Sequence, residues 1–265
     1  MFKKVLYATD LSESSLGVLN SLPNFKCLGI EEVVVLRVIN ITRLLGARGI
    51  NIDSYVKEIE KESVPKLEKI VERIGDMGYK ARLVIPLPVG DPVGEIAKIA
   101  EEEAVDAILM GSRGRSTIKA ILLGSTAEGI INKTDIPVIV FKGNGKIFDR
   151  IIYAHDFSKK AENLGKYVRF VAKSCKSDVV VVHILERGEV LEERWLNRIV
   201  TGLREDGINV KIVIGEGNPP KEIVKIAEIE NATCIFVGRS GVGSRILGST
   251  ADFVVRYSKV PVFVV

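Results

Sequence analysis

The sequence predicts an α/β fold that is built twice, as two doubly wound parallel sheets of five strands joined head to tail. Three observations support this prediction. Segments of the first half return in the second half, short unbroken apolar runs alternate with segments of helical spacing, and 265 residues exceed the usual size of one domain. Alternating strands and helices are typical of a parallel sheet that helices cover on both faces.

The repeat is visible as matched segments. Three pairs have offsets of 146, 127 and 124 residues: 3–12 with 149–158, Gly90–Pro92 with Gly217–Pro219, and Leu123–Glu128 with Leu247–Asp252. The second copy is therefore shorter by 19 residues (146 − 127) around Arg43 to Ser63, and by three more (127 − 124) further along the chain.

The elements of each copy follow from local patterns. Continuous runs of Val, Ile and Leu, which mark strands buried on both faces, predict strands in the first copy at 3–8, 32–38, 80–85, 106–110 and 137–141. Residues at helical spacing, such as Val93, Ile96 and Ala97, lie between them. The polar segment 143–146 is the predicted linker, so we expect the copies to span 1–144 and 145–265.

Composition excludes several classes of protein. A net charge of +4 and 6% aromatic residues argue against nucleic-acid binding. No apolar run approaches the roughly 18 residues of a membrane span, and the opening segment turns polar too soon for a signal peptide. Cys27, Cys175 and Cys234 are far apart with no C-x-x-C spacing, so we expect no disulfide, no zinc site and a cytoplasmic location.

The candidate site lies where the strands end, because ligands of doubly wound sheets bind at the carboxyl edge. Gly111 and Gly114 follow the fourth strand and are expected to adopt positive φ. Gly124 and Ser125 open the last helix, where free amides favour an anion. Each has a plainer interpretation: the glycines as turn residues, Ser125 as an N-cap, and Asp10 as the cap of a helix beginning near Ser12.

The spacing Gly111-x-x-Gly114, nine residues, Gly124-Ser125 resembles the glycine signature of the nucleotide-binding universal stress protein family. The run 8–12, Ala-Thr-Asp-Leu-Ser, resembles that family's first strand ending, with Ala in place of Pro. The resemblance covers nearly all of both copies, so the chain is similar to a tandem universal stress protein.

The resemblance implies a sheet order of 3-2-1-4-5 and an adenine nucleotide, ATP or AMP, with Mg²⁺ as an optional companion. Adenine would lie near Ala8 and Val38, ribose near Asp10 and the nucleoside against Met110. The phosphates would contact the glycine loop and the helix that follows, with Thr9 and Arg113 nearby; the residues concerned are Gly111, Gly114, Gly124, Ser125 and Thr126.

The second copy departs from this signature. Six residues, not nine, separate Gly241 from Gly248, His155 replaces Thr9, and Val237 replaces Met110. Whether it binds nucleotide is left open, with AMP as a ligand of fewer phosphates; the corresponding residues are Ala154, Asp156, Ile184, Val237, Gly238, Gly241, Gly248, Ser249 and Thr250.

The apolar fifth strands, 138–141 and 262–265, would otherwise be exposed edges, so we expect them to pair within the chain as a pseudo-dimer. A further homodimer is left open. The main functional hypothesis is an adenine-nucleotide sensor or regulator in stress response. Its alternatives are a slow ATPase or phosphoryl-transfer enzyme, although the G-x-x-x-x-G-K-[ST] loop is absent, and a docking platform that uses 43–63.

Overall fold

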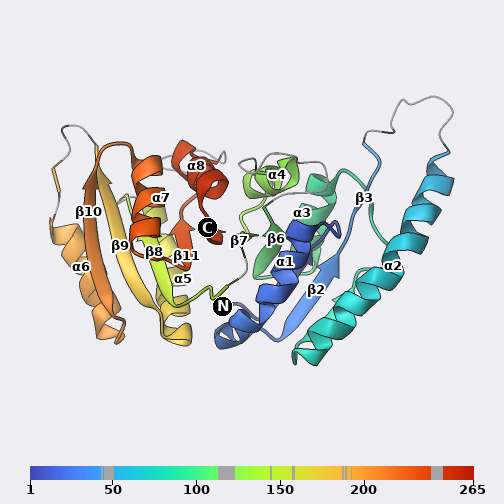
Figure 1. The fold of residues 1–265 in the computed structure, drawn as a ribbon, viewed down its shortest axis with the longest axis horizontal. Coiled ribbons are helices and arrows are strands. Elements are labelled where there is room, and N and C mark those ends of the chain that lie inside the picture. The colour runs from blue at the N-terminus through green and yellow to red at the C-terminus, as the bar shows by residue number, and fades with distance from the viewer. Residues whose placement is uncertain are drawn as a thin grey trace.

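The fold is α/β, with two copies of a doubly wound unit in one continuous sheet flanked by helices (Figure 1). The computed structural model describes residues 1–42, 44, 51–112, 123–143, 145–156, 159–186, 188, 190–191, 193–239 and 247–265. Arg113, Gly114 and Gly241, three of the predicted site residues, lie outside the described residues.

Ten strands form the main sheet, in the order β10-β9-β8-β11-β12-β7-β6-β1-β2-β4. Read from its outer edge toward the middle, each half is a sheet of order 3-2-1-4-5, as the resemblance implied. The strands of the first copy are β1 (Lys4–Ala8), β2 (Glu32–Leu36), β4 (Lys80–Leu83), β6 (Ala107–Gly111) and β7 (Val138–Phe141). Those of the second are β8 (Arg150–Ala154), β9 (Asp178–Leu185), β10 (Val210–Glu216), β11 (Cys234–Val237) and β12 (Val262–Val264).

A separate two-stranded sheet, which the sequence did not predict, joins β3 (Ile39–Asn40) to β5 (Val89–Gly90). The Ile39 N–H also donates to the Pro88 carbonyl over 2.8 Å. In the first copy, β2 and β4 pair along only four residues, whereas the corresponding strands of the second copy, β9 and β10, pair along seven. The extra sheet therefore fixes the chain just after β2, where Val38 was predicted to contact the base.

Helices cover both faces of the sheet. They are α1 (Glu13–Ser21), the 3-10 helix η1 (Leu22–Leu28), α2 (Ile52–Asp76), α3 (Pro92–Glu102), α4 (Ser125–Lys133), α5 (Lys159–Cys175), α6 (Glu193–Glu205), α7 (Pro219–Ile229) and α8 (Ser249–Tyr257). One apolar core lies under α1, α2, α5 and α6, and the other lies under α3, α4, α7 and α8. Figure 1 shows α2 and α6 at the two outer ends of the molecule, with α4 and α8 near its middle.

The segment that only the first copy contains is largely helix. From Ile52 it forms the start of α2, a helix of 25 residues, whereas its counterpart α6 has 13. Asn51 caps α2 by accepting the Ser54 N–H over 3.0 Å. The expected long loop before it lies, apart from Ile41, Thr42 and Leu44, outside the described residues.

The two copies meet through antiparallel pairing of β12 with β7. Phe263 lies opposite Ile139, its own counterpart at the offset of 124, so a pseudo-two-fold axis passes between them. Beside this pairing, Phe263 stacks on Phe236 with ring centroids 4.2 Å apart, and Phe25 meets Phe148 at 5.2 Å. Aromatic side chains from both copies therefore pack at the junction.

The expectation of no disulfide is wrong. Cys27 at the end of η1 bonds Cys175 at the end of α5, although 148 residues separate them in sequence. The error has a physical reason: at the offset of 146, Cys175 corresponds to position 29, two residues from Cys27, so the pseudo-two-fold axis brings nearly equivalent positions together. Cys234 is buried and forms no disulfide.

Among the described residues, no helix is long and apolar enough to cross a membrane.

The inter-copy disulfide should stabilise the native chain strongly. Closing a loop of 148 residues lowers the entropy of the unfolded chain, an effect of about 5 kcal/mol in the chain-entropy model. We expect reductant, or the variant Cys27→Ser/Cys175→Ser, to lower the urea midpoint, and reductant to leave the double variant's midpoint unchanged. Three free thiols in the denatured, non-reduced chain would contradict the bond.

Candidate functional site

The turn between β1 and α1 is held by its own polar side chains. The Thr9 hydroxyl accepts the Leu11 N–H at 3.1 Å, and Leu11 adopts a left-handed φ of 63°. The Asp10 carboxylate accepts the Ser12 N–H at 3.0 Å. Ser12, and not Asp10, is the N-cap of α1, so the interpretation of Asp10 as that cap is wrong. Asp10 instead lies two residues before this cap, and its carboxylate is oriented by the hydrogen bond from the Ser12 N–H.

Thr9 belongs to a buried network beneath this turn. Its hydroxyl lies 2.9 Å from that of Ser15, and the Tyr7 hydroxyl donates to the Ser15 carbonyl at 2.8 Å. Burial raises the pKa of Tyr7 to about 12, so this donor keeps its proton at all physiological pH values. Thr9 thus has a structural role in shaping the site edge.

Three predicted nucleoside contacts come together on one face of the sheet. Ala8 and Met110 are buried neighbours in the pairing of β1 with β6, and half-buried Val38 packs against the same core. On the opposite face, the buried Arg37 donates to the Asp10 carbonyl over 3.2 Å, which ties the end of β2 to the β1–α1 turn. The carboxyl ends of β1, β2 and β6 therefore form one rigid edge.

Gly111 is required for a close backbone contact that the sequence did not predict. It ends β6 without a positive φ, so the expectation of a left-handed conformation is wrong. A Cβ at this position would lie 2.7 Å from the backbone of Ser14 in α1. Close approach of helix and strand therefore requires glycine here. At Gly238, the counterpart, a Cβ would meet nothing within 4 Å.

Both copies close the glycine loop with the same backbone contact. The Gly124 N–H donates to the Ser112 carbonyl over 2.9 Å, and the Gly248 N–H donates to the Arg239 carbonyl over 2.5 Å. Each contact joins the end of the fourth strand to the start of the last helix. Gly124 and Gly248 therefore lie at the same sheet edge as the ends of β6 and β11.

The helices that follow this contact have open N-termini. Gly124 is the N-cap of α4 and Gly248 that of α8, and neither makes a side-chain capping hydrogen bond. Four other helices have such a bond, from Ser12, Asn51, Asp91 and Asn218. The interpretation of Ser125 as an N-cap is therefore wrong, since Ser125 is the first helical residue. Ser125 and Ser249 are exposed, and Thr126 and Thr250 are half-buried.

In the second copy, histidines replace the polar groups under the turn. The buried His183 directs its Nδ1 at the His155 carbonyl, 2.8 Å away, as Arg37 does toward Asp10 in the first copy. Burial lowers the pKa of His155 to about 4, opposed by the nearby Asp156 and assisted by His183. Ile184 and Val237 are buried on the other face of the sheet. The carboxyl edge of the second copy's sheet thus keeps the contact between its second strand and the turn after its first strand, with different buried side chains.

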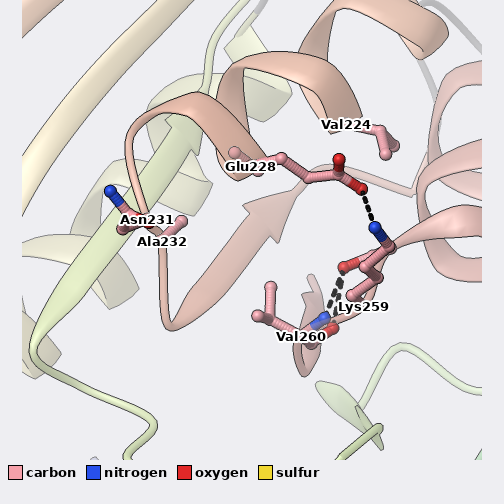
Figure 2. A pocket seen from close by; sticks show the side chains of 8 residues that line it. Val224, Glu228, Asn231, Ala232, Lys259 and Val260 are labelled. Atoms are coloured by element: carbon pink, nitrogen blue, oxygen red, sulfur yellow. Dashed lines mark hydrogen bonds and ion pairs between the residues drawn. The ribbon is translucent and has the colours of Figure 1, made fainter.

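A cavity of about 310 Å³ lies elsewhere on the second copy, between α7, α8 and the start of β12. In Figure 2 its lining includes Val224, Asn231 and Val260, and the Lys259 ammonium reaches the Glu228 carboxylate across 3.0 Å. Because Val260 precedes β12 and Ala232 precedes β11, the cavity lies at the amino ends of the strands, away from the candidate site.

Within the described residues, no group of three or more His, Cys, Asp or Glu side chains is arranged to hold a metal ion.

Comparison with known proteins identifies relatives along nearly the whole chain. Residues 1–142 and 186–265 match the universal stress protein family. The crystal structure of a universal stress protein from Archaeoglobus fulgidus is 39% identical, with a TM-score of 0.85 over 98% of this chain and 97% of that chain. A universal stress protein of Methanocaldococcus jannaschii is 40% identical over 157 residues, which are 54% of this chain and 96% of the relative. One from Bacillus subtilis is 27% identical over 54% of this chain and 100% of its own length.

The two glycines provide a matched pair of substitutions. Gly111→Ala would push a methyl group into the Ser14 backbone, and overpacking of this kind costs about 1–3 kcal/mol of unfolding free energy. We expect Gly238→Ala, with open space around it, to change stability by less than about 0.5 kcal/mol. Urea unfolding of both variants measures this difference, and equal stabilities would show that the β6–α1 contact is misplaced.

The chain should lose stability in mild acid because of His155. Its folded pKa of about 4 lies below the usual 6.5, so protons bind the unfolded state first. The contribution of neutral His155 is complete above pH 6.5 and is lost as the pH falls toward 4, by up to about 3 kcal/mol. We expect His155→Thr, which restores the first-copy residue, to flatten unfolding free energy against pH in this window. An unchanged slope would refute the assignment.

Proposed function

This chain belongs to the universal stress protein family, and we propose that its first copy binds an adenine nucleotide and reports nucleotide occupancy as a regulator in stress response. The observation that carries the proposal is the open N-terminus of α4, which the Gly124–Ser112 hydrogen bond joins to the end of β6, at the same carboxyl edge of the sheet as Asp10. We further propose that the two copies are domains spanning 1–144 and 145–265.

The phosphates would bind the start of α4. The first helical hydrogen bond there joins the Glu128 N–H to the Gly124 carbonyl over 3.1 Å. The amides of Ser125, Thr126 and Ala127 precede it, so they have no acceptor within the helix. These free amides and the positive end of the helix dipole both lie at the N-terminus of α4, an arrangement that favours a phosphate group. The exposed Ser125 hydroxyl is a further donor at this position.

The nucleoside would lie on the apolar side of the same edge. Ala8, Val38 and Met110 provide that surface, and β3 fixes the backbone just after Val38. Asp10 would accept hydrogen bonds from the ribose hydroxyls, since a carboxylate has acceptor sites beyond the one that receives the Ser12 N–H. An apolar surface with a few oriented polar groups is typical of nucleotide sites. This combination supports ATP or AMP over a simple anion.

A magnesium ion, if it accompanies ATP, would be held mainly by phosphate oxygens and water, as this ion commonly is in nucleotide sites. This fits the described residues, which include no cluster of acidic and imidazole ligands.

The second copy keeps the same closing hydrogen bond and the same uncapped helix. We propose that it accepts a nucleotide with fewer phosphates, such as AMP, because three residues fewer follow its first glycine pair.

A capping substitution would test the first site without unfolding the protein. Gly124 has an extended backbone (φ −65°, ψ 140°) that suits aspartate, and an Asp N-cap would stabilise α4 by roughly a few tenths of a kcal/mol relative to glycine. Its carboxylate would also occupy the amides that should bind phosphate. We therefore expect Gly124→Asp to abolish MgATP binding in calorimetry while keeping or raising the melting temperature.

Gly248→Asp, at the equivalent position of α8, is the matched control. It should leave the first site able to bind MgATP, and it should remove any second-site binding of AMP. No heat of binding with millimolar MgATP in the unsubstituted chain would overturn the proposal.

A further inference from the structure

One arginine of the second copy caps a helix of the first. Arg239 directly follows Gly238, and its guanidinium donates to the Ile131 carbonyl over 2.9 Å and to the Ile136 carbonyl at short range. Ile131 lies in the last turn of α4, where carbonyls have no partner within the helix and the dipole favours a cation. Arg239 is half-buried there, and its partial desolvation lowers its pKa. Losing either carbonyl contact would leave the guanidinium partly desolvated and without that acceptor, which favours its present position.

The other side of the same loop is also bound to α4. The Leu247 N–H donates to the Asn132 side-chain oxygen over 2.6 Å. Arg239 and Leu247 are joined in turn by the hydrogen bond from the Gly248 N–H to the Arg239 carbonyl. The C-terminal turn of α4 therefore holds both chain segments that meet at the entrance of α8. Arg256 of α8 adds an ion pair to Glu128 of α4 over 2.9 Å.

These contacts differ between the two copies. The counterpart of Arg239 in the first copy is Ser112, a buried residue whose short side chain cannot span the junction. The end of α8 is capped differently, by Lys142 from beyond β7, which donates to the Arg256 carbonyl over 2.7 Å. At its C-terminal end α4 thus contacts Arg239 and Leu247, the two residues that lie beside the entrance of α8, whereas α8 contacts Lys142.

We propose that α4 couples the two candidate sites, with Arg239 as the positioning residue that links occupancy at the N-terminus of α4 to the entrance of α8. The inference rests on the proposed nucleotide binding of the first copy. A helix of nine residues is about 14 Å long and moves as a rigid rod. The contacts of Arg239 at one end of this helix therefore also restrain its first turn, where the phosphate would bind.

The thermodynamic consequence is reciprocal. With Arg239 in place, the second copy restrains α4, so less conformational freedom remains to be lost when phosphate binds. Removing the restraint should weaken binding at a site that Arg239 does not touch. Coupling between sites in one protein is typically 5-fold or more in affinity.

The experiment uses the full chain and amide hydrogen exchange during titration with MgATP. Protection of 125–127 reports occupancy of the first site, and protection of 249–252 reports the entrance of α8. We expect Arg239→Ser, which installs the first-copy residue, to weaken the first-site affinity by about fivefold and to speed exchange at 249–252 without ligand. Asn132→Ala removes only the hydrogen bond from the Leu247 N–H. It should weaken the first-site affinity and speed exchange at 249–252 as well, but each by less than Arg239→Ser does.

The control is Cys27→Ser/Cys175→Ser, which loosens the junction on the opposite face of the sheet and leaves α4 untouched. It should leave the first-site affinity unchanged. An equal loss in this control would show general loosening of the junction and overturn the coupling. MgATP binding that Arg239→Ser leaves unchanged would also overturn it, while the proposed function would stand. No protection of 125–127 in the unsubstituted chain would overturn both.

Discussion

Antiparallel pairing of β12 with β7 is the contact on which the rest of this molecule depends. At its centre Phe263 faces its own counterpart Ile139, so the pairing defines the pseudo-two-fold axis as well as the junction. It also removes both fifth-strand edges, which would otherwise present unpaired amides and carbonyls to other chains. Two small sheets, each with one exposed apolar edge, become a single sheet of ten strands.

The axis brings different chemistry together on the two faces of this sheet. On one face, nearly equivalent positions near the axis meet as the Cys27–Cys175 disulfide, beside an aromatic cluster that includes Phe25 and Phe148. On the other face, α4 contacts Arg239, Leu247 and Arg256 of the second copy through polar groups. A covalent bond thus stabilises one side, and hydrogen bonds and an ion pair hold the side that carries the candidate phosphate helices.

The two copies keep one design at the site edge with different side chains. In the first copy, Arg37 donates to a carbonyl of the β1–α1 turn. Its counterpart in the second copy, His183, donates to the carbonyl of His155, just after β8. The first copy therefore buries a permanent cation near its site, while the second buries imidazoles, of which His155 resists protonation. Two sites of similar backbone shape consequently differ in local charge and in their response to pH.

The sequence by itself determined the repeat and the fold class, because buried strands such as 32–36 and helix starts such as Gly124-Ser125 have local signatures. It did not determine roles that depend on distant neighbours. Gly111 reads as a turn glycine until the backbone of Ser14 is placed against it, and Asp10 reads as a cap until Ser12 takes that position. The disulfide and the Arg239 contact join residues more than a hundred positions apart. Only the tertiary structure decided these, since the pairing of β12 with β7 brings such residues within bonding distance and no local pattern encodes that proximity.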